Sequence, residues 1–159
     1  MLSNYKSLLT IVIVLFSFFI LSVSCKKDKT RYEVKYTSTS ASSSSTWYSD
    51  KAQAAISKDT LYITGNKDNK SSITIIVSNS APGDYTISLT NVQALVLINK
   101  DGTKNTGTNF LSSEGVVSIL KKDEKKKTVS GTFSIKAIST SLLQQEKIEG
   151  EFTVKYTSY

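Results

Sequence analysis

Few residue types in this chain could carry out chemistry, because it contains no histidine and only one cysteine, Cys25. This composition excludes Ser-His-Asp and Cys-His catalysis and any zinc site that depends on histidine. The best remaining candidates for acid–base work are Glu149 and Glu151, whose spacing would place both carboxylates on one face of a strand. Such a pair can act as acid and base or bind calcium. Lys147 and Lys155 nearby favour a solvated, charge-balanced face instead, so we expect no catalytic site and no cofactor.

An oxygen-rich segment is a second candidate for ligand chemistry. Asn66, Asp68 and Asn69 lie close together in the chain, but they lack the ligand spacing of a recognised calcium loop. Asn and Asp are also common turn residues, because their side chains hydrogen-bond to the nearby backbone. We therefore expect a plain turn here and no metal site.

Four aromatic residues form the candidate ligand-binding set: Trp47, Tyr48, Tyr62 and Tyr85. Gathered on one surface, their rings could bind a carbohydrate or a peptide. The structural alternative is that Trp47, an isolated Trp at the start of a strand, closes one end of a β-sandwich. The sequence leaves both interpretations open.

Cys25 follows a segment that is typical of export signals. Lys6 precedes sixteen mostly apolar residues, Leu8 to Val23, which as a helix would reach about 24 Å, short of the roughly 30 Å hydrocarbon core of a membrane. The residues 22–25, Ser-Val-Ser-Cys, resemble a lipobox, in which a small residue precedes the acylated cysteine. We predict cleavage between Ser24 and Cys25 and attachment of lipid, such as palmitate, to Cys25. The alternatives are an uncleaved anchor with a structural cysteine and ordinary secretory cleavage nearby.

The chain divides into three predicted parts. Residues 1–24 form a helical lipoprotein signal peptide, and residues 25–46 form a lipid-anchored, Ser/Thr-rich tether with a candidate first strand at Tyr32–Tyr36. Residues 47–159 form one all-β domain. This length is sufficient for a hydrophobic core, and acylation of Cys25 would leave no cysteine for a disulfide.

The net charge of +7 is concentrated in local segments. Lys6 belongs to the leader, residues 26–31 and residues 121–127 each carry +3, and the rest of the chain is balanced. A nucleic-acid-binding domain more often has a basic stripe with interleaved aromatic residues, so we expect no nucleic-acid partner. We interpret the first segment as a tether beside lipid headgroups and the second as a solvated hairpin loop.

Hydrophobic residues after the tether alternate with a period of two, which indicates strands. Short runs rich in Val, Ile, Thr, Tyr and Phe are separated by turn residues, for example at 81–84 and 100–103. The nearly continuous apolar run Ala94 to Ile98 predicts a strand covered on both faces. Only Asp50–Ser57 and Ser139–Glu146 could hold a helical turn. We predict an all-β fold, an antiparallel β-sandwich or flattened barrel of about 8–10 short strands after the N-terminal signal helix.

Two segments near the C-terminus repeat one pattern nineteen residues apart, at 129–136 and 148–155. Each places β-branched residues, a glycine and a phenylalanine on one face of a strand. We predict a C-terminal β-hairpin in which Phe133 and Phe152 are core anchors. Gly131 and Gly150 would make room for a neighbouring aromatic ring or mark a bend.

The motifs at 82–86 (PGDYT), 131–134 (GTFS) and 150–152 (GEF), together with Trp47, give the chain a family resemblance. With the leader and Cys25, they resemble a group of small lipoproteins of Bacteroidota that carry similar motifs on a predicted β-sandwich. The resemblance covers most of residues 47–156. It implies no activity, because the group has none to carry over.

These observations predict a lipid-anchored module of the cell envelope that binds a ligand or partner and is not an enzyme. Its partners would be the lipid bilayer, reached through acylated Cys25, and an envelope protein or a glycan. Basic residues at 26–29 favour the periplasmic side of the outer membrane over the cell surface. The alternative is a structural or inhibitor-type accessory subunit of an envelope complex, and a carboxylate-dependent hydrolase is less favoured.

Overall fold

The computed structural model describes residues 31–88, 90–100, 108–140 and 144–159. Arg31–Tyr159 form one compact unit. The predicted signal peptide, the lipid site at Cys25 and most of the predicted turn at 100–103 lie outside the described residues. The ten strands are β1 (Glu33–Thr39), β2 (Ser44–Tyr48), β3 (Lys51–Ser57), β4 (Thr60–Lys67), β5 (Ser71–Val77), β6 (Gly83–Ile87), β7 (Ala94–Lys100), β8 (Thr108–Asp123), β9 (Thr128–Ser139) and β10 (Gln145–Ser158).

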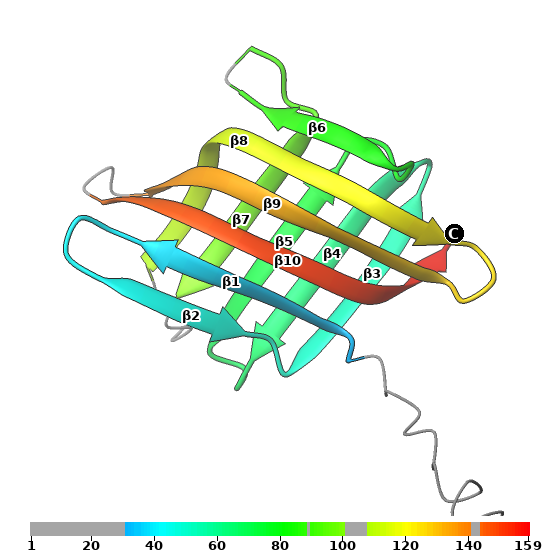
Figure 1. The fold of residues 1–159 in the computed structure, drawn as a ribbon, viewed down its shortest axis with the longest axis horizontal. Helices are drawn as coiled ribbons and strands as arrows, with labels where there is room; N and C mark the ends of the chain where they lie inside the picture. The colour runs from blue at the N-terminus through cyan, green and yellow to red at the C-terminus, as the bar shows by residue number, and fades with distance from the viewer. Residues whose placement is uncertain (1–30, 89, 101–107, 141–143) are drawn as a thin grey trace, which may run out of the picture. The chain divides into compact units, whose positions relative to one another are not determined.

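Seven strands close into a flattened barrel with two layers (Figure 1). The back sheet comprises β3, β4, β5, β7 and the first residues of β8, and the front sheet comprises β10, β9 and the rest of β8. The front strands run obliquely across the back strands. Beyond the ring, β1 and β2 extend the front sheet next to β10, and β6 extends it next to β8.

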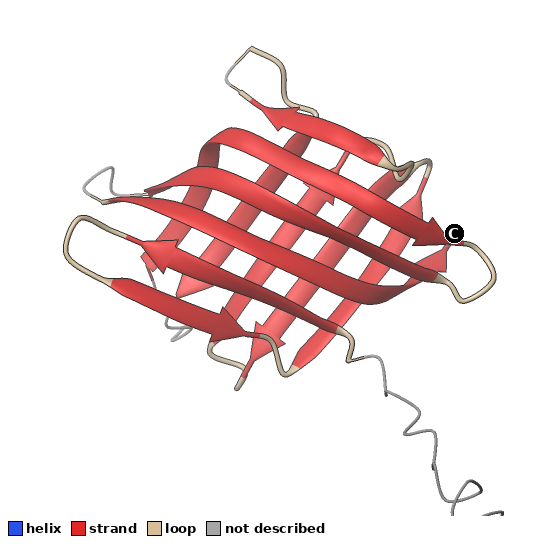
Figure 2. Cartoon of the chain, in the orientation of Figure 1, coloured by secondary structure: helices blue, strands red, loops and turns tan. Residues whose placement is uncertain are grey.

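The architecture confirms the predicted all-β flattened barrel, and Figure 2 shows that strands make up the described elements. One pairing departs from the predicted antiparallel pattern. The end of β10, Tyr156–Ser158, pairs in parallel with Ala54–Ile56 of β3. β10 and β3 are far apart in the sequence and become neighbours only where the barrel closes. Because no hairpin turn links them, nothing requires them to run in opposite directions.

The core lies between the two sheets and follows directly from the period-two alternation. Along β5, for example, Ile73, Ile75 and Val77 are buried while the residues between them are partly exposed. Burial of each such aliphatic side chain contributes about 1.5–3 kcal/mol relative to exposure. The barrel is therefore held together mainly by packing of its inward faces.

Phe133 and Phe152 interlock with two glycines in the β9–β10 pair. Phe133 lies opposite Gly150, and Phe152 lies opposite Gly131. A Cβ atom on Gly150 would lie 2.4 Å from the Phe133 ring, and one on Gly131 would lie 2.5 Å from the Phe152 ring. Both phenylalanines are buried, so the predicted hairpin, its core anchors and the space-making role of the glycines are confirmed.

β8 bends where it passes from the back sheet to the front sheet. Its pairing with β9 shifts register between Ser112 and Glu114, as in a β-bulge. Gly115 follows with a φ of 136°, and a Cβ atom there would lie 2.3 Å from the carbonyl oxygen of Ser134. Glycine therefore allows both the backbone conformation and the close approach of β9 at this corner.

Two local predictions were wrong, and packing explains both. Lys51–Ser57 is a strand and not a helical turn, because pairing with β4 and β10 overrides the helix propensity of its alanines and lysine. β7 is buried on one face only, and Leu97 is 41% exposed, because no described element covers the outside of the back sheet. The other predicted helical turn, Ser139–Glu146, includes residues 141–143, which lie outside the described residues.

The folded unit begins before Trp47. Val34 and Tyr36 of β1 are buried, and β1 pairs with β10 along its whole length. The Ser/Thr-rich segment that was assigned to a tether forms the ends of β1 and β2 and the turn between them, where the Ser40 N–H donates to the Ser43 carbonyl at 2.9 Å. The candidate first strand is thus an integral part of the front sheet.

Candidate binding surfaces

The four aromatic candidates do not form one surface. Trp47 and Tyr48 lie on β2, Tyr62 lies on β4, and Tyr85 lies on β6. β2 and β6 stand at opposite ends of the strand order, and β4 belongs to the other sheet. Tyr48 and Tyr62 are 44% and 42% exposed, so each could contact a ligand, but on different sides of the barrel.

Trp47 and Tyr85 are partly buried against the core. The Trp47 ring stacks on Tyr36 with 5.1 Å between centroids, and its Nε1 donates to Ser71 Oγ at 2.8 Å. These contacts tie β2 to β1 and β5. Tyr85 donates its hydroxyl to the Ala81 carbonyl at 2.7 Å, and burial raises its pKa. Both residues therefore have structural contacts that account for their positions.

Glu149 and Glu151 project from the front sheet, and each pairs with a lysine of its own. Lys147 Nζ lies 2.8 Å from Glu149 Oε1, and Lys35 Nζ lies 2.6 Å from Glu151 Oε1. The hydrogen bond from Lys147 lowers the pKa of Glu149, and the hydrogen bond to Glu151 raises the pKa of Lys35. A general acid needs a raised carboxyl pKa, so this arrangement favours solvated ion pairs over acid–base chemistry.

The oxygen-rich segment forms the tight turn between β4 and β5. Asp68 and Asn69 have φ values of 51° and 54°, and the Asp68 N–H donates to Asp50 Oδ2 at 3.0 Å. Asn and Asp adopt this left-handed conformation more readily than most residues. Within the described ranges, no three His, Cys, Asp or Glu residues cluster in a way that could hold a metal ion.

The lysine-rich segment is the hairpin turn between β8 and β9, as predicted, and part of it packs on Tyr156. The Tyr156 hydroxyl donates to Glu124 Oε2 at 2.7 Å. Lys122 Nζ and Lys127 Nζ lie 5.7 and 5.5 Å from the centre of the Tyr156 ring. Burial, reinforced by the hydrogen bond to Glu124, raises the pKa of Tyr156 to about 12. These two lysines therefore belong to a structural cluster at the seam between the sheets.

A mostly buried ion pair connects the two sheets at the other end of the barrel. Lys100, at the end of β7, pairs with Glu146 of β10, and Ser38 of β1 donates its hydroxyl to the same carboxylate. Lys100 Nζ also lies 4.9 Å from the centre of the Phe110 ring. This pair was not predicted from the sequence, although Lys100 continues the inward alternation of β7.

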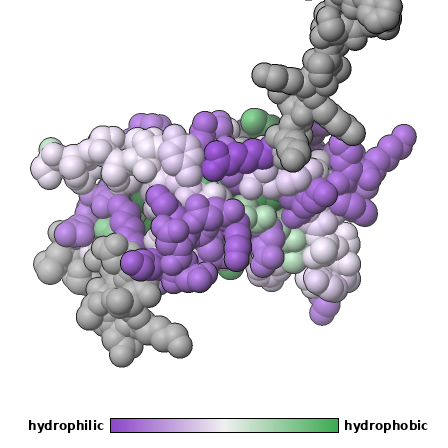
Figure 3. Space-filling view, turned by 90° about the horizontal axis from the view of Figure 1, so that it is seen from below, coloured by the Kyte–Doolittle hydropathy of each residue, from purple (hydrophilic) through white to green (hydrophobic). Residues whose placement is uncertain are grey.

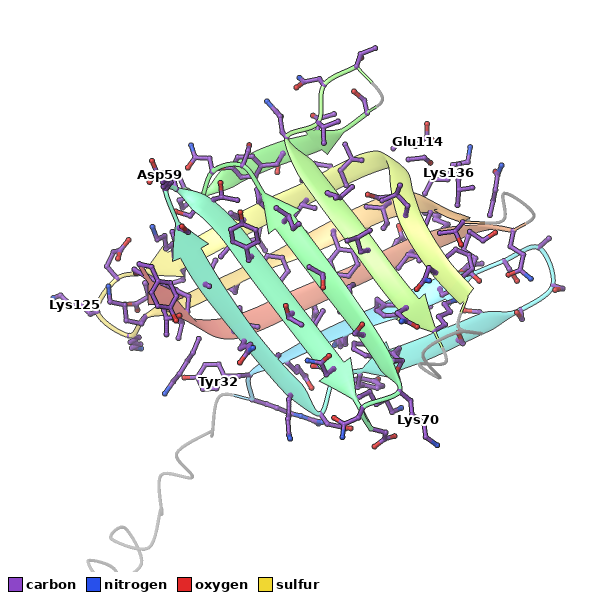
Figure 4. All side chains as sticks on the ribbon, turned by 180° about the vertical axis from the view of Figure 1, so that it is seen from behind. Tyr32, Asp59, Lys70, Glu114, Lys125 and Lys136 are labelled. Carbon is purple, nitrogen blue, oxygen red and sulfur yellow. The ribbon has the colours of Figure 1, made fainter. Side chains whose placement is uncertain are left out.

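A groove of about 400 Å³ lies on the front sheet, where Tyr48, Glu149 and Glu151 form part of its lining. Two larger grooves lie elsewhere on the described surface. One, of about 690 Å³, lies over β8, β9 and β10 and is lined by charged residues that include Glu114 and Lys136. These two side chains lie beside each other in Figure 4, with 3.5 Å between Lys136 Nζ and Glu114 Oε1. The other, of about 460 Å³, lies along the β3–β10 seam; Gln53, Tyr62 and Thr64 form part of its lining. We call it the seam groove.

The outer face of the back sheet carries almost no charge. Its outward side chains form three rows across β3, β4, β5, β7 and β8, and we call them together the back face. The rows are Lys51-Asn66-Ser72-Asn99-Asn109, Gln53-Thr64-Thr74-Leu97-Leu111 and Ala55-Tyr62-Ile76-Leu95.

Lys51, at the end of one row, is the one side chain of the back face that is charged at neutral pH. Of the charged residues labelled in Figure 4, Asp59 and Lys70 lie in the turns at the ends of back-sheet strands, and Glu114, Lys125 and Lys136 belong to β8, the β8–β9 turn and β9. The surface seen from below, in Figure 3, is mainly hydrophilic or near neutral, with hydrophobic colour in small patches. The back face therefore differs from its surroundings chiefly by its lack of charge.

One protein family matches residues 36–156, and its description is "Domain of unknown function (DUF6252)". The match covers well over half of the chain. The chain belongs to the DUF6252 family. No curated protein and no solved structure matches it.

The DUF6252 match begins within β1 and ends within β10, so it contains the closed ring and the whole back face. Cys25 lies outside the matched residues. In the described part of the chain, no helix has the length and apolar character needed to cross a membrane.

Proposed function

We propose that this DUF6252 protein is a lipid-anchored, non-catalytic binding module of the bacterial cell envelope, attached through Cys25. The observation that carries the proposal is the position of this cysteine. It follows the apolar leader directly, and the folded unit begins six residues later, at Arg31. The lipobox-like residues before Cys25 and the resemblance to small lipoproteins of Bacteroidota support the same conclusion.

Lipid at Cys25 would keep the barrel close to the bilayer. Six residues span at most about 20 Å when fully extended. The three lysines between Cys25 and Arg31 would lie near the headgroups, where each contributes about 1 kcal/mol of attraction if the lipids are anionic; Arg31 pairs with Glu33. Stable anchoring requires more than one chain, as a multiply acylated cysteine provides. We place the protein on the periplasmic side of the outer membrane.

Binding without catalysis is supported by the chemistry of the described side chains. Glu149 and Glu151, the best carboxylate pair, are each neutralised by a lysine on the solvent side of the front sheet. Histidine is absent from the sequence, and the one cysteine is assigned to lipid. The function that remains is presentation of the barrel surface to a ligand or partner.

Metabolic labelling with an alkyne fatty acid tests the anchor. We expect the full-length protein to incorporate the label and to partition with membranes, and the Cys25→Ala variant to lose both properties. Ser24→Ala is the matched control, because it keeps a small residue before the cysteine and should still be acylated. A Cys25→Ala protein that remained labelled and membrane-bound would disprove the proposal. Protease treatment of intact cells tests the side, since a periplasmic barrel should be protected.

A second candidate function, an accessory subunit of an envelope complex, is favoured by the free edges of the front sheet. Among the described residues, β2 pairs only with β1, and β6 pairs with β8 and is bridged to Val92 only at its last residue, Ile87. An unpaired strand edge can accept a strand from another protein. Crosslinking in living cells should then yield one defined protein adduct mapping to β2 or β6. A native mass that corresponds to the monomer in detergent extracts would argue against this function.

A further inference from the structure

We propose that the back face binds an uncharged oligosaccharide and that Tyr62 provides the ring on which a sugar stacks. This inference rests on the proposed binding function and gives it a site and a ligand class. It is carried by the charge, the chemical layout, the shape and the size of this surface.

The low charge of the back face indicates which class of ligand it can bind. Of the fourteen side chains in the three rows of the back face, Lys51 alone is charged, whereas about 25–35% of an ordinary soluble surface is charged. A surface without charge offers nothing to phosphate groups or anionic lipids, whose binding depends on Lys and Arg. It also avoids the cost of removing water from charged groups when a neutral ligand covers it. The complementary ligand is therefore uncharged.

The layout of the rows is the second argument. The row Lys51-Asn66-Ser72-Asn99-Asn109 supplies mainly amide and hydroxyl groups, and the row Ala55-Tyr62-Ile76-Leu95 supplies an aromatic ring and aliphatic groups. Amides and hydroxyls both donate and accept hydrogen bonds, as sugar hydroxyls require. The C–H face of a sugar ring needs an apolar partner, and Tyr62 has an accessible ring with a polar tip. These two rows lie about 14 Å apart, so different rings of one sugar chain would contact them.

Shape is the third argument, because the back face continues into the seam groove. Gln53, Tyr62 and Thr64 belong to both surfaces, so the 460 Å³ hollow adjoins the stacking ring. The two lysines of the groove, Lys127 and Lys155, lie 5.5 and 5.2 Å from the ring centres of Tyr156 and Tyr32. Lys127 also lies 3.7 Å from Glu124, but both lysines are exposed, so the seam groove carries positive charge that most of the back face lacks. The groove can hold one end of a chain of sugars that crosses the sheet.

The area of the back face favours an oligosaccharide over a second copy of the protein as its ligand. Five strands about 4.8 Å apart, with three rows of outward residues about 6.8 Å apart, cover about 450–500 Å². A stable protein–protein interface needs about 800 Å² per partner. The back face is too small for a stable dimer, but it is large enough for several sugar rings.

Affinity electrophoresis of the full-length protein in mild detergent tests the proposal. The gels contain amylose-type glucan, hydroxyethyl cellulose or galactomannan, with polygalacturonate as the charged counterpart. We expect at least one neutral polysaccharide to retard the protein and polygalacturonate not to do so. Tyr62→Ala should weaken the retardation about tenfold or more, as loss of a central aromatic contact does. Tyr62→Phe should retain it, because the ring remains.

Tyr48→Ala is the matched control, because Tyr48 is exposed to nearly the same extent but lies on the front sheet. It should bind as the unsubstituted protein does. Absence of retardation by every neutral polysaccharide, stronger retardation by polygalacturonate, or equal losses in Tyr48→Ala and Tyr62→Ala would each overturn the proposal. These results do not depend on the acyl label at Cys25, so failure of the sugar site and failure of the lipid anchor can be distinguished.

Discussion

The outer faces of the two sheets differ far more than their inner faces. Both inner faces are closely packed with apolar side chains. Outside, the front sheet carries cross-strand ion pairs such as Lys35–Glu151 and Lys136–Glu114, whereas the back face has one charge at its border. Exposed ion pairs of this kind contribute only about 0–1 kcal/mol each, so they chiefly keep the front sheet solvated. The shared core therefore maintains the fold, and we infer that the back face is available to the uncharged ligand proposed above.

The two sheets also differ in how tightly their backbones approach. In the front sheet, Gly131 and Gly150 lie against the rings of Phe152 and Phe133 and leave no space for a methyl group. In the back sheet, the glycine of β4, Gly65, has its nearest neighbours more than 3.0 Å from a Cβ position. The front sheet should therefore be less tolerant of added volume.

Gly150→Ala should have the largest effect on stability. Its Cβ atom would lie 2.4 Å from the Phe133 ring and 2.5 Å from the Lys35 carbonyl oxygen, and the backbone cannot move aside cheaply. We expect a loss of about 3 kcal/mol in the free energy of unfolding, measured by chemical denaturation. Gly65→Ala is the back-sheet control and should lose about 1 kcal/mol. Equal losses of stability in the two variants would show that the two sheets tolerate added volume equally well.

Lys100→Ala should have the next largest effect, because it breaks the one described charge pair that joins the sheets inside the barrel. Glu146 would keep a mostly buried charge without its lysine, which we expect to cost about 2 kcal/mol in thermal or chemical unfolding. The double variant Lys100→Met/Glu146→Gln should recover most of this loss, since no buried charge is left uncompensated. A double variant as unstable as the single one would show that packing, and not charge, holds this end together.

Tyr156 provides a smaller, pH-dependent test at the β3–β10 seam. Its folded pKa of about 12 exceeds the unfolded value of about 10, so its stabilisation is fully present below pH 10 and is lost as the pH rises towards 12. Ultraviolet titration should show a late tyrosinate step that disappears in Tyr156→Phe. Glu124→Gln should shift this step to lower pH, because a neutral amide repels tyrosinate less. An unchanged step in Glu124→Gln would contradict the contribution of Glu124.

Lys35→Ala should have the smallest effect, although it removes a short ion pair with Glu151. The pair is exposed on the front sheet, so we expect only a small loss of stability, which diminishes further at high salt. Salt titration of the thermal unfolding midpoint, with Thr74→Ala on the back face as an uncharged control, measures this effect. A loss of stability as large as that of Lys100→Ala would mean that exposed ion pairs on the front sheet contribute substantially to the stability of the fold.

The sequence could identify single residues that are able to contact a ligand, but it could not predict which of them lie together on one surface. Tyr62 is a candidate from the sequence only as one of four aromatic residues, and the structure adds that it lies on β4 and is 42% exposed. Its grouping with Trp47, Tyr48 and Tyr85 followed only from shared chemistry, and the structure places these residues on three strands in two sheets. The neighbours that matter to Tyr62, such as Gln53 and Ile76, come from the register of β3 and β5 with β4.

The sequence by itself determined most of the strands other than β2 and β3, their inward faces and the Gly–Phe pattern of β9 and β10, because side-chain direction in a strand alternates locally with a period of two. Only the tertiary structure decided that β8 turns a corner at Gly115, that β10 meets β3 in parallel, that Lys100 reaches Glu146 and that uncharged rows align across the back sheet. These features depend on which distant strands become neighbours and in which register. That choice is made by packing of the whole core, and no short segment of the sequence contains it.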